Sequence, residues 1–140
     1  MSVYLDASLL VSAFAQDTFS DRADAYLRQV SQTLVVSDLA AAEFSSVMAR
    51  RVRTGDQSKE DAHMAFANFD AWTARVAQRV ETTTSDVQAA TIFIRRLDLT
   101  LRTPDALHIA LARRTATALA TFDEKTATSA SALGLEVEPA

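Results

Sequence analysis

Three aspartates of this chain stand at positions where a carboxylate can take part in chemistry. Asp6 ends the apolar run of residues 3–5, and Asp123 follows the apolar run of residues 118–122. Asp105 lies in the first turn of a predicted helix that begins with a Thr-Pro pair, because proline is favoured at the first helical position. Each aspartate could instead be only a helix cap or a partner of the helix dipole, and the sequence leaves both interpretations open.

A fourth carboxylate, Glu43, lies on an apolar face of a predicted helix. Leu39 and Val47 are one turn away on either side, and Phe44 and Met48 extend the same stripe. A carboxylate on a core-facing stripe is unfavourable unless a cation or hydrogen-bond donors pair with it. Glu43 is therefore either a metal ligand or a side chain that reaches solvent or pairs with an arginine.

Convergence of these carboxylates would require a counter-ion. Two negative charges about 4 Å apart repel by roughly 4 kcal/mol at an effective dielectric constant near 20. A hard divalent cation removes this repulsion, and oxygen ligands favour Mg²⁺ or Mn²⁺ over zinc, for which the chain has no cysteine and only two histidines. Such a metal can activate water and hold the oxygens of a phosphodiester during hydrolysis. The candidate metal ligands and catalytic residues are Asp6, Glu43, Asp105 and Asp123.

Three further side chains could support such a site. Ser8 and Thr121 each lie two residues from one of the aspartates and could orient a ligand or a bound water, although local backbone capping is an equal alternative. His108 lies one helical turn after another aspartate, but its neighbours along the chain are apolar. We therefore favour a packed, hydrogen-bonded His108 over a metal ligand.

The basic residues are few but are nearly all arginine. A net charge of −4 counts mildly against a nucleic-acid binder, yet only Lys59 and Lys125 among the 14 basic residues are lysines. The planar guanidinium suits phosphate geometry. We therefore interpret Arg50, Arg51 and Arg102 as candidate RNA contacts, with solvated helix faces as the alternative.

The elements that must position these residues alternate between short strands and longer helices. This alternation predicts a parallel sheet with helices on both faces, and functional residues of such folds gather beyond the carboxyl ends of the strands. We expect one α/β domain over residues 1–140, with four to five short parallel strands and about seven helices. The expected strands are residues 3–5, 33–36, 79–81, 118–122 and 135–138, and the expected helices are 7–15, 20–30, 38–53, 58–76, 85–96, 103–114 and 124–133.

The composition is that of an ordinary folded domain. Hydrophobic residues make up 49% of the chain and charged residues 23%, which argues against disorder. No apolar run approaches the roughly 18 residues that a membrane span needs, and residues 1–6 lack the pattern of a signal peptide. Together with the absence of cysteine, these features lead us to expect a cytoplasmic protein with no membrane partner.

In their order, several segments resemble the PIN-domain nucleases, and in particular the VapC-type toxins of bacterial toxin–antitoxin pairs. The resemblance spans essentially the whole chain, and residues 105–110, Asp-Ala-Leu-His-Ile-Ala, are its most specific part. It departs at residues 115–117, Thr-Ala-Thr, where the family often has a glycine ahead of the fourth strand. The matching segments are residues 3–8, 37–43, 103–110, 119–123 and 132–135.

The resemblance implies a PIN fold and cleavage of RNA by an endonuclease that depends on Mg²⁺ or Mn²⁺. It implies a homodimer and a partner antitoxin that wraps the toxin, in a heterotetramer or a larger assembly. The RNA, the cleavage site, the antitoxin and the number of metal ions are not specified by the sequence. The implied metal-binding positions are Asp6, Glu43, Asp105 and Asp123.

Two other classes of function are compatible with part of the pattern. A receiver-like or phosphoryl-transfer domain would also place aspartates at strand ends, but such sites usually use a well-placed lysine, and the chain has only two lysines. A non-catalytic α/β interaction module would use the acidic residues only as caps. The position of Glu43 on an apolar stripe argues against that alternative.

Overall fold

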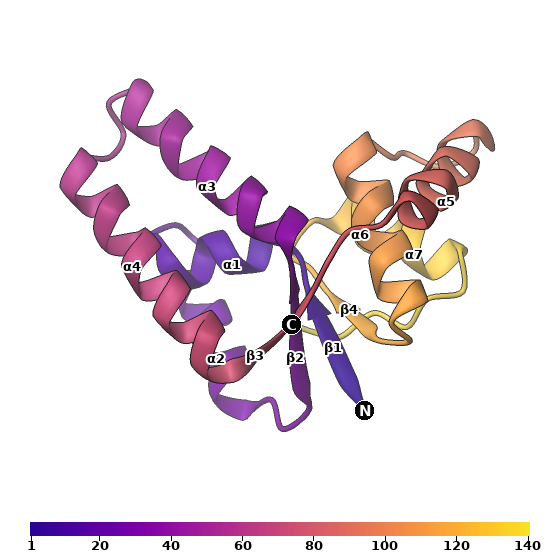
Figure 1. Ribbon diagram of the computed structural model, residues 1–140, viewed down its shortest axis with the longest axis horizontal. Helices are drawn as coiled ribbons and strands as arrows, with labels where there is room; N and C mark the ends of the chain where they lie inside the picture. The colour runs from indigo at the N-terminus through magenta and orange to yellow at the C-terminus, as the bar shows by residue number, and fades with distance from the viewer.

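Four short strands form a parallel sheet at the centre of the structure (Figure 1). A computed structural model describes residues 1–140. The sheet has the order β3-β2-β1-β4, so the first strand is central and pairs with both β2 and β4. The strands are β1 (Ser2–Leu5), β2 (Thr33–Ser37), β3 (Ala77–Val80) and β4 (Ala118–Ala120).

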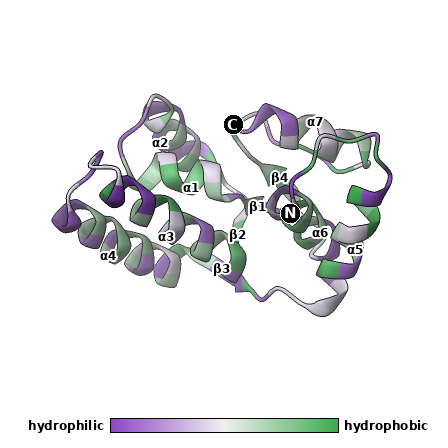
Figure 2. Cartoon of the chain, turned by 90° about the horizontal axis from the view of Figure 1, so that it is seen from above, coloured by the Kyte–Doolittle hydropathy of each residue, from purple (hydrophilic) through white to green (hydrophobic).

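Seven helices cover the two faces of this sheet. The sheet lies between α1–α4 on one side and α5–α7 on the other (Figures 1 and 2). No helix in the structure combines the length and the apolar character that crossing a bilayer requires. The helices are α1 (Ala7–Phe14), α2 (Ser20–Gln29), α3 (Asp38–Arg53), α4 (Lys59–Val76), α5 (Thr84–Arg95), α6 (Thr103–Arg114) and α7 (Glu124–Ala132).

The alternation of side chains along β1 explains why there are two layers of helices. Successive residues of a strand point to opposite faces of a sheet. Val3 and Leu5 are therefore buried in one apolar cluster with residues of α1, α3 and α4. Tyr4 points the other way and belongs to a second cluster with Ile109 and Leu111 of α6. Both faces of β1 are thus buried, and its carboxyl end is held firmly in place.

The structure confirms the predicted α/β class, the seven helices and four of the five expected strands. Residues 135–138, expected as an edge strand, form only one parallel bridge, between Val137 and Leu119. The Leu119 N–H donates to the Glu136 carbonyl at 2.9 Å, and the Glu138 N–H donates to the Leu119 carbonyl at 2.8 Å. The next N–H on this side of the segment, that of Ala140, donates to the Glu138 carbonyl at 2.9 Å instead of to β4, so the pairing ends at one bridge.

Helix α6 ends in a left-handed turn at Ala116, whose φ is +56°. The N–H of Ala116 donates to the Arg113 carbonyl at 3.2 Å, and the N–H of Thr117 donates to the Ala112 carbonyl at 3.0 Å. Glycine is the preferred residue in this pattern of hydrogen bonds. The turn thus falls at the segment where the family resemblance places a glycine and this chain has none.

Replacement of Ala116 by glycine is expected to stabilise the protein. A β-carbon disfavours left-handed backbone, so Ala116→Gly should raise the free energy of unfolding by about 0.5–1 kcal/mol. Urea denaturation measures this difference. Ala74→Gly, at an exposed position inside α4, is the matched control and should lower the same quantity by about 1 kcal/mol. An unchanged or lower stability for Ala116→Gly would show that the turn carries no strain.

An ion pair between a buried carboxylate and a partly exposed arginine links the start of α5 to the end of α6. Asp86 is only 1% exposed, and the Nε and Nη2 atoms of Arg114 donate to its two carboxylate oxygens at 2.8 and 3.0 Å. The N–H and hydroxyl of Thr83 donate to the same carboxylate. Burial by itself would raise the pKa of Asp86, but these donors outweigh burial and hold the pKa below its ordinary value.

This pair makes stability depend on pH in the acid range. Because the pKa of Asp86 is lowered in the folded state, the pair stabilises the fold above the unfolded value of about 3.9 and loses its effect as the pH falls below it. Arg114→Leu should lower the free energy of unfolding by about 2–3 kcal/mol at neutral pH. Denaturation at several pH values should show this loss shrinking in acid, while Arg95→Leu on α5 has little effect. A loss of unfolding free energy that does not vary with pH would contradict the lowered pKa that we assign to Asp86.

Candidate metal centre

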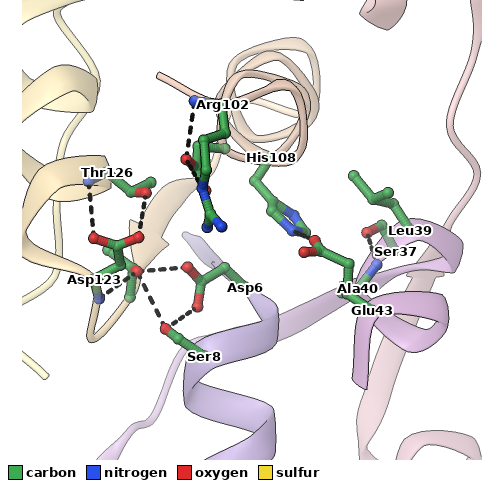
Figure 3. Close-up of polar contacts among 12 residues, drawn as sticks. Asp6, Ser8, Ser37, Leu39, Ala40, Glu43, Arg102, His108, Asp123 and Thr126 are labelled. Atoms are coloured by element: carbon green, nitrogen blue, oxygen red, sulfur yellow. Dashed lines mark hydrogen bonds and ion pairs between the residues drawn. The ribbon is translucent and has the colours of Figure 1, made fainter. Parts of the chain in front are cut away.

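Asp6 directly follows β1 and caps α1, so it lies at the carboxyl end of the central strand (Figure 3). Its carboxylate accepts hydrogen bonds from the hydroxyls of Ser8 at 2.6 Å and Thr121 at 2.5 Å, and from the Leu9 N–H at 3.3 Å. Burial raises the pKa of Asp6 above its ordinary value, and His108 and the hydrogen-bond donors offset this only in part. Asp6 is thus a buried acid whose negative charge is incompletely stabilised.

Ser8 and Thr121 join the ends of β1 and β4 around Asp6. Besides donating to Asp6, the Thr121 hydroxyl accepts the N–H of Asp123 at 3.0 Å. The Ser8 hydroxyl likewise accepts the N–H of Phe122 at 3.0 Å. Each hydroxyl therefore contacts both the carboxylate and the backbone that follows β4, which places Asp6 and Asp123 in one hydrogen-bonded unit.

Asp123 caps the first turn of α7. One of its carboxylate oxygens accepts the N–H of Lys125 at 3.0 Å and the N–H of Thr126 at 3.4 Å. The other accepts the hydroxyl of Thr126 at 3.1 Å, and Figure 3 shows both contacts with Thr126. The cap interpretation is therefore correct for this residue. It leaves room for a second role, since each carboxylate oxygen can accept more than one interaction.

A chain of hydrogen bonds leads from the sheet to Glu43. The Tyr4 hydroxyl contacts the Ser37 hydroxyl and the His108 Nδ1 atom, both at 2.6 Å. The His108 Nε2 atom in turn contacts the Glu43 carboxylate (Figure 3). Burial raises the pKa of Tyr4 far above its usual range, so the phenol keeps its proton. A carboxylate can only accept, so Nε2 of His108 carries a proton toward Glu43.

His108 is 3% exposed and hydrogen-bonded at both ring nitrogens, as expected for a packed histidine. The Glu43 side chain is 30% exposed and therefore reaches partly into solvent. The partner of Glu43 is His108 and not an arginine, which was the alternative expected from the sequence.

Asp105 is paired with Arg102, a residue that the sequence analysis interpreted as an RNA contact. The Arg102 Nε and Nη2 atoms lie 3.2 and 3.3 Å from the two carboxylate oxygens of Asp105. Hydrogen bonding to Asp105 raises the pKa of Arg102, and the charges of Asp123 and Glu43 add to this effect. The Arg102 side chain is 76% exposed. It is therefore a counter-ion of Asp105 at the protein surface (Figure 3).

Two open pockets adjoin these side chains. One, of about 620 Å³, has Asp105 and Asp123 in its wall. The wall of the other pocket contains an ion pair between Arg51 and Asp17, 3.9 Å apart. Asp17 was not among the candidate site residues predicted from the sequence. This second pocket has a volume of about 430 Å³, and its wall includes Glu43, Asp123 and all three predicted RNA contacts, Arg50, Arg51 and Arg102.

The four carboxylates occupy one end of the sheet but do not form a ready metal cage. No three histidine or acidic side chains come close enough together to hold a metal ion. The carboxylates are instead shared among hydroxyl, histidine, arginine and backbone donors. The residues still fit a divalent ion, because all four offer oxygen ligands, the charge of Asp6 is incompletely stabilised, and the exposed Arg102 side chain is free to leave Asp105.

Tyr4 and Ser37 also support this site, and neither was predicted to do so from the sequence. A signal for Tyr4 was present, since a tyrosine in a fully buried strand needs a partner for its hydroxyl. Ser37 was considered only as a helix cap, and it is one: its hydroxyl accepts the N–H of Ala40 at 3.0 Å. Its second contact, with Tyr4, joins β1 and β2 and could not be predicted without the strand order.

The parallel sheet and the carboxylates at its carboxyl end match a known class of protein. The family model of the PIN domain matches residues 3–130, and the chain therefore belongs to the PIN-domain family. Within this family its similarity is to VapC-type proteins. It is 31% identical over 139 residues to "Ribonuclease VapC46" of Mycobacterium tuberculosis, covering 97% of this chain and 95% of that protein.

Solved structures of VapC-type proteins share the fold. VapC20 of Mycobacterium tuberculosis, described as a sarcin–ricin loop cleaving toxin, has a TM-score of 0.76 at 20% identity, and the match covers 98% of this chain and 99% of that one. VapBC2 of Rickettsia felis, bound to a DNA fragment from its promoter, has a TM-score of 0.70 at 15% identity and covers 99% and 98%. At these identities the likeness shows a common fold.

Proposed function

We propose that this chain is an endoribonuclease that depends on Mg²⁺ or Mn²⁺ and acts as the toxin of a toxin–antitoxin pair. The observation that carries the proposal is the placement of four carboxylates beyond the carboxyl end of the sheet, with the buried Asp6 incompletely compensated and with only Arg102 and His108 paired to Asp105 and Glu43. The relative at 31% identity is named as a ribonuclease, which supports RNA as the substrate. In this proposal the metal ligands are Asp6, Glu43, Asp105 and Asp123.

In the proposed reaction, different residues of the chain position the metal ligands and bind the RNA phosphates. A bound divalent ion would supply an activated water and offset negative charge on the phosphate. Ser8 and Thr121 hold Asp6 in one orientation, and His108 does the same for Glu43. The arginines of the 430 Å³ pocket are suited to bind phosphates that flank the cleaved bond.

The proposal includes a partner protein. A structure described as a toxin–antitoxin complex from Klebsiella pneumoniae shares the fold, with a TM-score of 0.58 at 17% identity. We propose by analogy that this chain forms a homodimer and binds an antitoxin that covers the carboxylates, in a heterotetramer or a larger assembly. We place it in the cytoplasm because cellular RNA is found there.

Incubation of the antitoxin-free chain with total cellular RNA tests the proposed function. Discrete fragments should form with Mg²⁺ or Mn²⁺ and not with EDTA, and the same metals should raise the melting temperature. Asp70→Asn, which removes an exposed carboxylate of α4, is the matched control and should cleave normally. Absence of both cleavage and a metal-dependent rise in melting temperature would refute the proposal and favour an interaction module.

Arg102 is expected to compete with the metal for Asp105. Arg102→Gln removes the positive charge, so Mn²⁺ should bind more tightly, with a dissociation constant lowered roughly 2- to 5-fold, because exposed ion pairs contribute up to about 1 kcal/mol. Isothermal titration calorimetry measures this constant. Arg50→Gln changes an arginine of the pocket wall that has no carboxylate partner and should have a smaller effect. Weaker Mn²⁺ binding by Arg102→Gln would mean that Arg102 supports the metal site.

A further inference from the structure

Two phenylalanines form a stacked pair at the edge of the proposed active site. The ring centroids of Phe19 and Phe122 are 5.5 Å apart, and the ring planes are inclined by 27°. The Arg22 guanidinium lies over both rings, 5.3 Å from the Phe19 centroid and 4.8 Å from the Phe122 centroid. Phe122 packs on the apolar core, whereas Phe19 is 40% exposed. Phe122 is thus anchored by the core, while Phe19 is the ring of the pair that solvent reaches.

This stacked pair belongs to the same pocket as the carboxylates. Phe19 and Phe122 both line the 430 Å³ pocket whose wall also contains Glu43 and Asp123. Phe122 is adjacent in sequence to Asp123. Its N–H donates to the Ser8 hydroxyl, which in turn donates to the Asp6 carboxylate. The aromatic rings are therefore fixed relative to the residues proposed to bind the metal. The pocket volume lies within the range of small-ligand sites, about 300–1,000 Å³.

The composition of the pocket wall indicates what would occupy it. An exposed aromatic ring offers a flat surface for stacking, and every nucleobase has a face that can stack on it. Arg50 and Arg51, on the same wall, offer guanidinium groups suited to phosphates. Bases inside a duplex are already stacked on their neighbours, so only an unpaired base is free to lie on Phe19.

We propose that Phe19 and Phe122 form a stacking subsite for one unpaired nucleobase of RNA, next to the phosphate that is cleaved. This inference rests on the proposed function and names two residues that would position its RNA substrate.

A binding experiment in EDTA separates stacking from cleavage. The probes are a fluorescent 12-nucleotide oligoadenylate and an abasic ribose-phosphate oligomer of the same length, which keeps the charge and lacks the bases. By fluorescence anisotropy, the parent chain should bind the oligoadenylate more tightly than the abasic oligomer. Phe19→Ala should weaken oligoadenylate binding roughly 5- to 100-fold, as for the loss of one stacked base, and leave abasic binding unchanged.

Three further variants keep this experiment decisive. Phe19→Leu retains apolar volume but has no aromatic face, so its affinity for the oligoadenylate should fall as expected for Phe19→Ala. It serves as the test variant if Phe19→Ala folds poorly. Phe19→Trp keeps an aromatic ring, so it should bind the oligoadenylate more tightly than the abasic oligomer, as the parent chain does. Val87→Ala, at a half-exposed position on α5, should bind both probes as the parent does.

The outcomes distinguish this inference from the proposed function. Equal binding of both probes by the parent chain, or unchanged oligoadenylate binding by Phe19→Leu, would overturn the stacking subsite. If such a chain still cleaves RNA with Mn²⁺, only the subsite is refuted, and Phe19 is then better explained as a contact for a protein partner. A preference for bases without metal-dependent cleavage would support the subsite and refute the nuclease activity.

Discussion

Asp6→Asn is expected to give a folded protein that cleaves RNA at least about 1,000-fold more slowly, because the stabilisation lost with a metal is several kcal/mol. Asn keeps one oxygen that can accept from Ser8 and from the Leu9 N–H, and in place of the oxygen that accepts from Thr121 it has an amide group that can donate to the Thr121 hydroxyl. The rise in melting temperature with Mn²⁺ should disappear as well. Rates of RNA cleavage and melting curves with Mn²⁺ or EDTA measure the two effects, with Asp70→Asn as the control.

The same variant should be more stable than the parent when no metal is present. The pKa of Asp6 is raised because burial disfavours the charged form, so ionised Asp6 destabilises the folded state above that pKa. Asp6→Asn should therefore have the higher melting temperature in EDTA at pH 7. This advantage should shrink as the pH falls through the raised pKa, where the parent becomes neutral too. A less stable variant at pH 7 would mean that the structure needs the charge of Asp6.

Glu43→Gln is expected to lower cleavage by roughly 100-fold or more while leaving the fold intact. The amide oxygen of glutamine can still accept from Nε2 of His108, so the hydrogen-bond chain that ends at Glu43 survives. Single-turnover cleavage with Mn²⁺ and thermal unfolding in EDTA measure the two properties separately.

Glu43→Leu is the matched variant that removes the acceptor. It leaves the buried Nε2–H of His108 without a partner, so the free energy of unfolding should fall by about 1–3 kcal/mol. Stability would thus be lost with Leu and kept with Gln, whereas cleavage would be lost with both. Full cleavage by Glu43→Gln would show that Glu43 serves only as a partner of His108.

The elements of this fold were predictable because the sequence marks their ends. A Thr-Pro pair starts α6, and Gly134, with φ of +83°, follows the end of α7. Residues 135–138 have the alternation of an edge strand, but that pattern carries no information about pairing length. The pairing is limited to one bridge because the next donor, the Ala140 N–H, binds the Glu138 carbonyl.

The positions of the candidate ligands were predictable, but the partners of two of them were not identified. Glu43 was placed on a core-facing stripe by helical periodicity alone. Its contact with His108 joins residues 65 positions apart and depends on how α3 and α6 meet beyond the sheet. The Arg102–Asp105 pair has the i, i+3 spacing of helical ion pairs, a local signal that the interpretation of Arg102 as an RNA contact overlooked.

The stacked pair of Phe19 and Phe122 could not be predicted from either segment. Phe19 lies in the connection before α2, where no periodic pattern predicts which way its side chain points. Phe122 was predicted from the sequence to belong to an apolar strand, whereas β4 ends at Ala120. The two rings meet because β1 and β4 are neighbours and the segments after them lie at the same end of the sheet.

The most direct test is a crystal structure of the chain soaked in Mn²⁺, with anomalous scattering used to locate the metal. We expect a manganese peak bound by Asp6 and by at least one of Glu43, Asp105 and Asp123, with Arg102 moved away from Asp105. Asp6→Asn crystals treated in the same way should lack the peak. Density that shows no manganese at these carboxylates, with Arg102 still paired to Asp105, would contradict the metal centre proposed for this chain.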